Sequence, residues 1–286
     1  MPNASMNVFE IISHSYYELT AAERKTADYV MQNRERTQYL SIGELAEESG
    51  VAEATVSRFC RSLGYKGYNA FKLAIANAGA PRRSYKPAAD PEKDPDDTLS
   101  LARDLYATEN EALQQTLSLL RPEAIDRAVE ILHTARKVLC MGQGGSMILA
   151  SEAAHLFSIC DGKFIPVSDS HMQVISSATL SEEDAVLFFS YSGATRDMME
   201  TLSVVRAQGA KIILITRFPR SPGAALADVV LQCGSNESPL QHGSVPARIA
   251  QLFLLDILFA RLDRLDPERC QENRQRIAAA LADKHL

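Results

Sequence analysis

Residues 187–197 read LFFSYSGATRD, and the rest of the chain is arranged around this stretch. An apolar run stops abruptly in small hydroxyl residues and a glycine, and a helical pattern starts directly after them. This order predicts a buried strand, a tight turn and the first turn of a helix. Hydroxyl and backbone N–H groups that converge on the positive end of a helix form an anion site. We therefore expect the turn to bind a phosphate group.

The sequence on both sides of this stretch alternates between strands and helices. Short apolar runs predict strands at residues 137–141, 164–167, 185–189, 211–216 and 228–232. Strands that alternate with helices form a parallel sheet with helices on both faces. Ligands of such sheets bind at the carboxyl ends of the strands, which is where the hydroxyl-rich turn should lie.

A second loop of small residues, GQGGS at 142–146, follows the first predicted strand and should face the hydroxyl-rich turn. It is not a dinucleotide loop, because Met147 stands where the pattern G-x-G-x-x-G requires its last glycine. The next strand also lacks the closing acidic residue of a dinucleotide fold. No G-x-x-x-x-G-K-[ST] segment is present. The sequence therefore predicts no nucleotide cofactor.

The first eighty residues carry helical patterns only. Thr20 with Glu23, and Ser41 with Glu44, fit the S/T-x-x-E capping box that opens a helix. Gly50 can take the left-handed conformation that ends a helix. Another helix begins at residue 52 or 53, so two short helices are joined by a tight glycine turn. This arrangement predicts a helix-turn-helix.

The second helix of such a unit enters the major groove of DNA with its N-terminal residues against the bases. We expect its exposed residues to be Glu53, Ala54, Thr55, Ser57 and Arg58. Arg58 can donate to guanine, and Thr55 and Ser57 can reach bases or phosphates. The residues placed to meet backbone phosphates are Arg61, Lys66 and Lys72.

Local charge supports this interpretation although the chain as a whole has a net charge of -6. Basic residues dominate positions 51–86, where Glu53 is the single acidic residue. A local basic face is what DNA binding requires. The alternative is a structural helical hairpin or a protein-docking module. The aromatic set Tyr65, Tyr68 and Phe71 is predicted to be core rather than a base-stacking surface.

Residues 79–97 read GAPRRSYKPAADPEKDPDD, and four prolines among charges predict a solvated linker. We expect a helix-turn-helix domain at 1–79, a linker at 80–95 and an α/β domain at 96–286. Acidic Asp96 and Asp97 suit the start of a long helix.

The five cysteines are widely spaced and never form a C-x-x-C pair, so they are predicted to be buried thiols. No apolar run approaches the length of a membrane span, and the N-terminus lacks the pattern of a signal peptide. The sequence therefore predicts a cytoplasmic protein without a membrane partner.

The order of these segments resembles the RpiR family of bacterial transcriptional regulators over nearly the whole chain. The similar segments are LGYKGYNAFK, GQGGS, SDSHMQ, SYSGATRD and ARIAQLFLLDILF. The resemblance implies an all-α helix-turn-helix domain joined to an α/β three-layer sandwich with a five-stranded parallel sheet, the sugar isomerase (SIS) domain. It implies a regulator that responds to a sugar phosphate and acts as a homodimer or homotetramer on palindromic double-stranded DNA.

The resemblance also assigns residues to the ligand. Ser190, Ser192 and Thr195 match the phosphate loop of the SIS domain, and Gly193 matches its glycine of close approach. Ser146 matches the serine of the first loop. Ser and Thr also cap ordinary helices, so helix capping is the alternative role of these hydroxyl groups.

Each of the other polar residues near the predicted sheet edge has two possible roles. His171 contacts the sugar or caps a helix, and Glu237 binds a sugar hydroxyl or is solvated. Arg248, close to His242, pairs with a phosphate or with another subunit. Glu152 and His155 have the spacing of metal ligands but lack further partners, so no metal is predicted.

The sequence is compatible with three functions: a DNA-binding regulator, a phosphosugar isomerase, and a sugar sensor that binds a protein instead of DNA. A phosphosugar isomerase with an accessory helical domain needs a general base, and only Glu237 and His171 are candidates. A DNA-binding regulator needs none and explains the helix-turn-helix. We therefore predict a regulator that is not an enzyme and has no catalytic residue and no cofactor.

Overall fold

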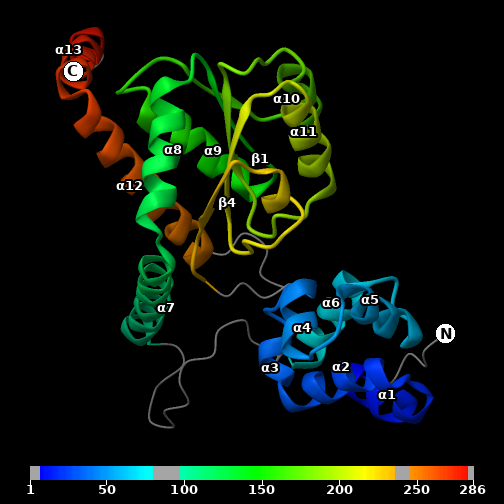
Figure 1. Cartoon of the computed structure of the whole chain (residues 1–286). Helices are drawn as coiled ribbons and strands as arrows, with labels where there is room; N and C mark the ends of the chain where they lie inside the picture. The colour runs from blue at the N-terminus through cyan, green and yellow to red at the C-terminus, as the bar shows by residue number, and fades with distance from the viewer. Residues whose placement is uncertain (1–6, 80–96, 236–244, 283–286) are drawn as a thin grey trace. The chain divides into compact units, whose positions relative to one another are not determined.

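The computed structural model describes residues 7–79, 97–235 and 245–282 (Figure 1). The chain divides into two compact units, with the boundary between Leu105 and Tyr106. The predicted linker at 80–95 lies outside the described residues, and the predicted domain limits stay a prediction. Among the described helices, none combines the length and the apolar character that a membrane crossing requires.

The first unit is helical, as predicted. Its elements are α1 (Val8–Ser15), the 3-10 helix η1 (Tyr16–Glu18), α2 (Ala21–Gln32), α3 (Arg34–Thr37), α4 (Ile42–Glu48), α5 (Glu53–Ser62) and α6 (Tyr68–Gly79). Both predicted capping boxes are confirmed at Thr20 and Ser41. A third capping box, from Asn7 to Glu10, opens α1 and was not predicted.

The turn between α4 and α5 follows the geometry expected of its glycine. Gly50 has a φ of 65°, a conformation that side chains rarely adopt. The Val51 amide donates to the Ala46 carbonyl at 2.9 Å, and the Gly50 amide donates to the Glu47 carbonyl at 3.0 Å. These two bonds form a Schellman motif, which ends α4 and directs the chain into α5.

Aromatic residues after α5 belong to the core of this unit. Phe71 is fully buried and packs edge to face on Phe59, with ring centroids 5.3 Å apart, and on Tyr65. Tyr68 donates its hydroxyl to the Leu40 carbonyl at 2.8 Å. These contacts confirm that the aromatic set is core rather than a base-stacking surface.

The second unit holds the predicted parallel sheet. Its strands are β1 (Val138–Gly142), β2 (Phe164–Val167), β3 (Ala185–Phe189), β4 (Lys211–Thr216) and β5 (Val229–Gln232). All pair in parallel, in the order β2-β1-β3-β4-β5. The helices after α6 are α7 (Thr98–Leu119), which crosses the boundary between the two units, α8 (Pro122–Thr134), α9 (Gly145–Phe157), α10 (Ser170–Ser177), α11 (Arg196–Ala207), η2 (Ala224–Leu226), α12 (Val245–Leu265) and α13 (Pro267–Leu281).

The sheet separates two hydrophobic layers, which confirms the three-layer fold. Helices α8, α9 and α12 cover one face together with strand residues such as Val138 and Cys140. Leu139 and Met141 face the opposite layer, which α11 covers. Figure 1 shows these helices on the two sides of the strands. Helix α13 was not predicted.

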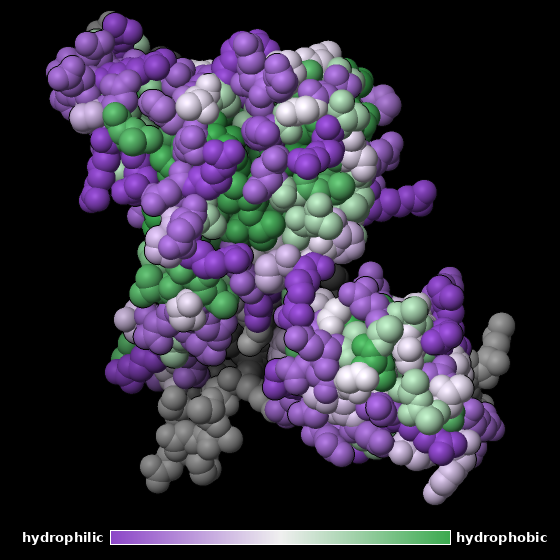
Figure 2. Space-filling view, viewed as in Figure 1, coloured by the Kyte–Doolittle hydropathy of each residue, from purple (hydrophilic) through white to green (hydrophobic). Residues whose placement is uncertain are grey.

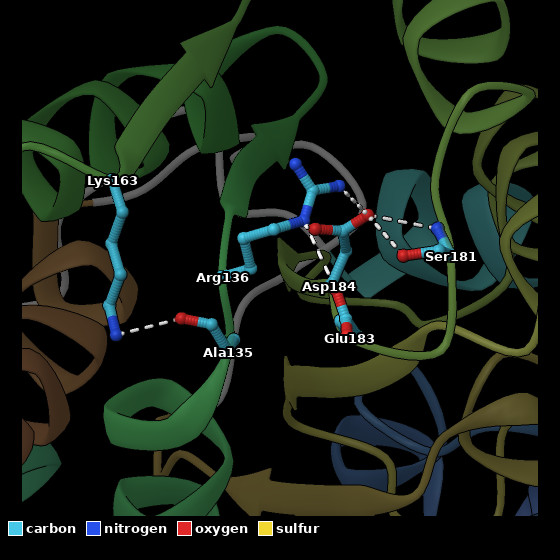
Figure 3. Close-up of polar contacts among 6 residues, drawn as sticks. All are labelled: Ala135, Arg136, Lys163, Ser181, Glu183 and Asp184. Atoms are coloured by element: carbon cyan, nitrogen blue, oxygen red, sulfur yellow. Dashed lines mark hydrogen bonds and ion pairs between the residues drawn. The ribbon is translucent and has the colours of Figure 1, made fainter.

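Polar contacts close the amino edge of the sheet (Figure 3). Buried Asp184, directly before β3, accepts hydrogen bonds from the amide and hydroxyl of Ser181 and from Arg136 Nη2 at 2.9 Å. Lys163, directly before β2, donates its Nζ to the Ala135 carbonyl at 2.9 Å. These contacts hold the strand starts together, so the loops at the opposite edge are built on a rigid base.

All five cysteines are buried and none of them forms a disulfide, as predicted. Burial raises the pKa of the thiols of Cys60, Cys140 and Cys160 to about 12. Thiols of this kind stay protonated and unreactive at neutral pH.

Candidate functional site

The two loops of small residues leave the sheet side by side. Gly142 at the end of β1 is the register partner of Phe189 at the end of β3. The chain runs from β1 to β2 on one side and continues with β3 on the other, so β1 and β3 flank the topological switch point. Ligands of open α/β sheets bind at this point. The residues predicted to bind a phosphate group therefore lie where the fold places a ligand.

The turn at residues 190–195, named the hydroxyl turn below, folds tightly around Gly193. The Gly193 amide donates to the Ser190 hydroxyl at 3.2 Å, and Ser190 is 5% exposed. Gly193 has a φ of 58°, and a Cβ atom on it would lie 2.6 Å from Ser221 Cβ. Only glycine fits this position, because its φ is positive and a side chain would clash with Ser221.

The hydroxyl groups of this edge do not cap the helices behind them. Thr195 is the N-cap residue of α11, and its side chain makes no capping hydrogen bond. The facing helix α9 starts at Gly144, which has no side chain to cap it. By contrast, Asp169 caps α10 by accepting a hydrogen bond from the Met172 amide at 2.8 Å. The N-terminus of α11 thus keeps donors that an anion can use, whereas in α9 the amides of Ser146 and Met147 donate to the carbonyls of Gln143 and Gly144.

The other predicted hydroxyls lie on the same two loops. Ser192 is exposed and accepts a hydrogen bond from the Ala194 amide at 3.3 Å inside the turn. Ser146 is half-buried in the first turn of α9. The hydroxyls of Ser146, Ser192 and Thr195 therefore come from the two loops that flank the switch point.

Residues that the sequence did not single out support these loops. Gln173 of α10 is fully buried, and its Nε2 donates to the carbonyls of Gly142 at 2.9 Å and Val167 at 2.8 Å. It thereby ties the ends of β1 and β2 to α10. Thr216 at the end of β4 donates its hydroxyl to the Tyr191 carbonyl at 3.0 Å. The sequence contained one sign of the role of Thr216, namely a polar residue at the end of an apolar strand.

The remaining ligand candidates occupy different places. His171 is exposed in the first turn of α10, beside the end of β2. Arg248 is half-buried in the first turn of α12, and its Nε is buried without a hydrogen-bond partner. Glu237 and His242 lie outside the described residues. Their predicted roles stay predictions.

The candidate DNA-reading helix is α5. The exposure of its side chains differs from the prediction at Thr55. Thr55 was expected to be exposed but is only 6% exposed. It precedes the buried Phe59 by four residues, so both side chains lie on the same face of α5. Its hydroxyl accepts a hydrogen bond from Arg58 Nη2 at 3.3 Å. Ser57 is half-buried. Of the residues predicted to lie at the DNA, Glu53, Ala54, Arg58, Arg61 and Lys66 are exposed.

A buried carboxylate fixes this helix to α2. Glu23 accepts hydrogen bonds from the Thr20 hydroxyl at 2.7 Å and from the Ser62 hydroxyl at 2.9 Å. Burial works to raise the pKa of Glu23, but the hydrogen bonds from Thr20 and Ser62 and the charge of Arg58 outweigh it and lower the pKa. The ionised carboxylate therefore joins the start of α2 to the end of α5.

No group of three His, Cys, Asp or Glu side chains suited to a metal ion occurs among the described residues. Glu152 and His155 are both exposed on α9.

Two family models match separate parts of the chain. The helix-turn-helix domain of the rpiR family matches residues 6–82, and the SIS domain matches residues 131–261. The regulator HexR of Pseudomonas aeruginosa is 32% identical over 252 residues, which cover 88% of this chain and 87% of HexR. A transcriptional regulator of Caldanaerobacter subterraneus is 31% identical over 253 residues, covering 88% and 89% of the two chains.

Solved structures are similar as well. NanR of Vibrio vulnificus, complexed with ManNAc-6P, has a TM-score of 0.85 at 25% identity and covers 98% of this chain and 99% of its own. The sugar isomerase domain of an RpiR transcription factor from Sphaerobacter thermophilus has a TM-score of 0.58 at 24% identity, covering 63% of this chain and 98% of its own. The chain therefore belongs to the RpiR family of helix-turn-helix transcriptional regulators.

Proposed function

We propose that a sugar phosphate bound between the loops after β1 and β3 controls the affinity of this regulator for operator DNA. The observation that carries the proposal is the uncapped start of α11 behind three hydroxyl residues and a glycine turn. Side-chain hydroxyls and helix N–H groups are donors, and a phosphate group is an acceptor of matching charge. NanR, similar over almost the whole chain, was solved in complex with ManNAc-6P.

In this proposal the phosphate group accepts hydrogen bonds from Ser190, Ser192 and Thr195 and from backbone amides of the turn. Ser146 and His171 contact the sugar from the loops after β1 and β2, and Glu237 contributes a carboxylate. The ligand changes DNA binding only by binding one arrangement of the regulator better than the other.

A thermal-shift screen against aldose and ketose phosphates, with N-acetylmannosamine 6-phosphate included, tests the ligand. Each sugar phosphate is paired with its unphosphorylated sugar and with inorganic phosphate. Ser192→Ala is expected to abolish the shift, whereas Ser203→Ala, exposed on α11, leaves it unchanged. Equal shifts with both variants would show that the ligand binds elsewhere.

On the DNA side, α5 is proposed to read bases with Arg58 and Ser57, while Arg61 and Lys66 bind backbone phosphates. Thr55 then acts by orienting Arg58, because its hydroxyl accepts from the guanidinium group. DNA selected from a random pool provides the operator for anisotropy titrations. Arg58→Ala should weaken binding by about 1–3 kcal/mol and relax the sequence preference. Arg276→Ala, exposed on α13, is the matched control.

We propose that the protein acts as a homo-oligomer in the cytoplasm, where operator DNA lies. Helix-turn-helix regulators read two half-sites about 34 Å apart and use a dimer to do so. Tyr106 and Leu117 on α7 are 71% and 61% exposed and stand eleven residues, or about three turns, apart on one helix face. Figure 2 shows hydrophobic residues at the surface of α7. Light scattering of the wild type and of Leu117→Asp tests whether this face joins two copies.

The proposal includes that the bound sugar is sensed and not converted. Aldose–ketose isomerisation needs a general base that moves a proton between adjacent carbons. His171 is exposed at the rim of the site, and Glu237 lies outside the described residues. Incubation with the same panel of sugar phosphates should give no interconversion by NMR. Turnover that disappears in Glu237→Gln would identify an isomerase instead.

A further inference from the structure

Ser235, three residues after the end of β5, has a strained backbone. Among the residues that the structure describes, it alone has a positive φ without being glycine, at 131°. A residue with a side chain stays in this region only where its surroundings hold it. Residues of this kind concentrate at ligand clamps and switch regions. The hydrogen-bond partners that hold Ser235 in this conformation therefore indicate its function.

The first of these groups belongs to the hydroxyl turn. Tyr191, in the middle of the turn, donates its hydroxyl to the Ser235 carbonyl at 2.9 Å. Arg217 Nε donates to the same oxygen at 3.1 Å. The Tyr191 carbonyl accepts hydrogen bonds from the Thr216 hydroxyl and the Arg217 amide, both at 3.0 Å. A shift of the turn is thereby transmitted to the Ser235 carbonyl.

The second group belongs to α7. The Ser235 amide donates to Gln115 Oε1 at 3.1 Å, and the Gly234 amide donates to the hydroxyl of buried Thr116 at 2.9 Å. A Cβ atom on Gly234 would lie 2.5 Å from the Thr116 amide nitrogen. Gly234 therefore packs directly on the α7 backbone, and the two hydrogen bonds join the strand end to the side chains of Gln115 and Thr116.

We propose that Ser235 is a relay that transmits occupancy of the hydroxyl turn to α7. The proposal rests on the proposed function, because its input is a sugar phosphate bound at residues 190–195. Helix α7 is the output, because it is the first helix after the DNA-binding domain in the chain. The carbonyl of Ser235 is hydrogen-bonded to the hydroxyl turn, and the amide of the same residue is hydrogen-bonded to α7.

The strain gives the relay two arrangements. With Tyr191 bonded to its carbonyl, Ser235 is held at positive φ. When the phosphate group draws the backbone of the turn toward itself, the Tyr191 hydroxyl moves, and Ser235 relaxes or is held more firmly. A change of the φ angle at Ser235 turns its amide relative to its carbonyl, so Gln115 loses or gains a hydrogen bond. A two-state element that both sites bias is the physical requirement for coupling between them.

The test compares Tyr191→Phe, which removes one hydroxyl, with Tyr17→Phe, which removes the same atom from an exposed tyrosine of η1. The full chain is used throughout. Hydrogen exchange of the amides at residues 112–119 is measured without ligand. Ligand affinity is measured calorimetrically with N-acetylmannosamine 6-phosphate and with inorganic phosphate. The affinity for DNA selected by the wild type is measured with and without each probe.

Tyr191→Phe is expected to speed exchange in α7 about fivefold, as the loss of one hydrogen bond predicts. It should still bind the probes, yet its DNA affinity should no longer respond to them. Tyr17→Phe should behave as the wild type. Unchanged exchange in Tyr191→Phe, or a full DNA response, would overturn the relay. If the wild type binds neither probe, the proposed ligand is wrong, and the exchange measurement still decides whether the turn and α7 are coupled.

Ser235→Gly isolates the strain, because it keeps both backbone hydrogen bonds and makes a positive φ favourable. This variant should fold, bind the probes and show a smaller DNA response than the wild type. A full response with Ser235→Gly would show that the strain plays no part in the relay.

Discussion

Gly193 and Gly144 have nearly the same φ angle and very different surroundings. Their φ angles are 58° and 55°. Gly144, at the start of α9, has open space where a side chain would lie, whereas Gly193 in the hydroxyl turn faces Ser221 and Thr216. The pair therefore separates the effect of backbone strain from the effect of close packing.

We expect Gly193→Ala to destabilise the second unit by roughly 3 kcal/mol, since it adds a steric clash to the strain. Gly144→Ala should cost about 1 kcal/mol, the effect of strain alone. Urea unfolding followed by circular dichroism gives both values. Equal costs would show that Ser221 moves aside freely and that the turn is not tightly packed.

Glu23 is the residue at which pH acts on the first unit. Its pKa is lowered from the ordinary value of 4.5 because hydrogen bonds and Arg58 outweigh burial. A carboxyl group with a lower pKa in the folded state stabilises the fold fully above its unfolded pKa. This contribution is lost as the pH falls through the folded value, because the unfolded chain takes up the proton first.

We therefore expect Glu23→Gln to lower the stability of the first unit at pH 7 by about 1–2 kcal/mol. The variant should also lose less stability than the wild type when the pH falls below 4.5. Urea unfolding at several pH values measures both effects. Glu18→Gln, exposed in η1, is the control. Parallel pH profiles of Glu23→Gln and the wild type would contradict the assignment.

Helices α10 and α11 begin at the same edge of the sheet and differ in their N-caps. Asp169 caps α10 with its side chain, whereas the Thr195 hydroxyl is not used by α11. Side-chain caps contribute about 1 kcal/mol. A hydroxyl at an N-cap position that makes no capping bond contributes little stability and is available to a ligand.

We expect Asp169→Ala to cost about 1 kcal/mol of stability and Thr195→Ala less than about 0.5 kcal/mol. The order should reverse for ligand binding, where Thr195→Ala removes a phosphate donor. Denaturation and calorimetry on the same two variants measure both quantities. A Thr195→Ala variant that loses stability but binds the ligand normally would make Thr195 a structural cap.

At the scale of the whole molecule, the two units have separate hydrophobic cores. A ligand that binds only the second unit stabilises that unit by mass action, at about 2.7 kcal/mol when its concentration is one hundred times Kd. The first unit gains stability only through coupling. The chain contains no tryptophan, so hydrogen exchange is the measurement that resolves the two units.

We expect a saturating sugar phosphate to slow exchange strongly in core strands β1, β3 and β4. Exchange in α2, α5 and α6 should change much less. Inorganic phosphate at the same concentration is the control for general anion effects. Equal protection in both units would indicate that the chain unfolds as one cooperative body.

Local patterns in the sequence predicted most elements correctly. The boundaries of β2, β3 and β4 and the capping boxes at Thr20 and Ser41 agree with the structure. Strand hydrophobicity and capping depend on residues close in sequence, so a single sequence contains them. The missed helix α13 has a weak apolar stripe, and its one buried residue, Cys270, packs against distant parts of the chain.

The sequence by itself determined the family, the two folds and the two loops of small residues after β1 and β3, because motifs and periodicity are local properties. Only the tertiary structure decided that Thr55 is buried, that Gln173 ties two strand ends together and that Ser235 joins the hydroxyl turn to α7. These outcomes depend on neighbours far apart in the chain. The same hydroxyl residue caps a helix or remains available to a ligand according to where packing directs its side chain.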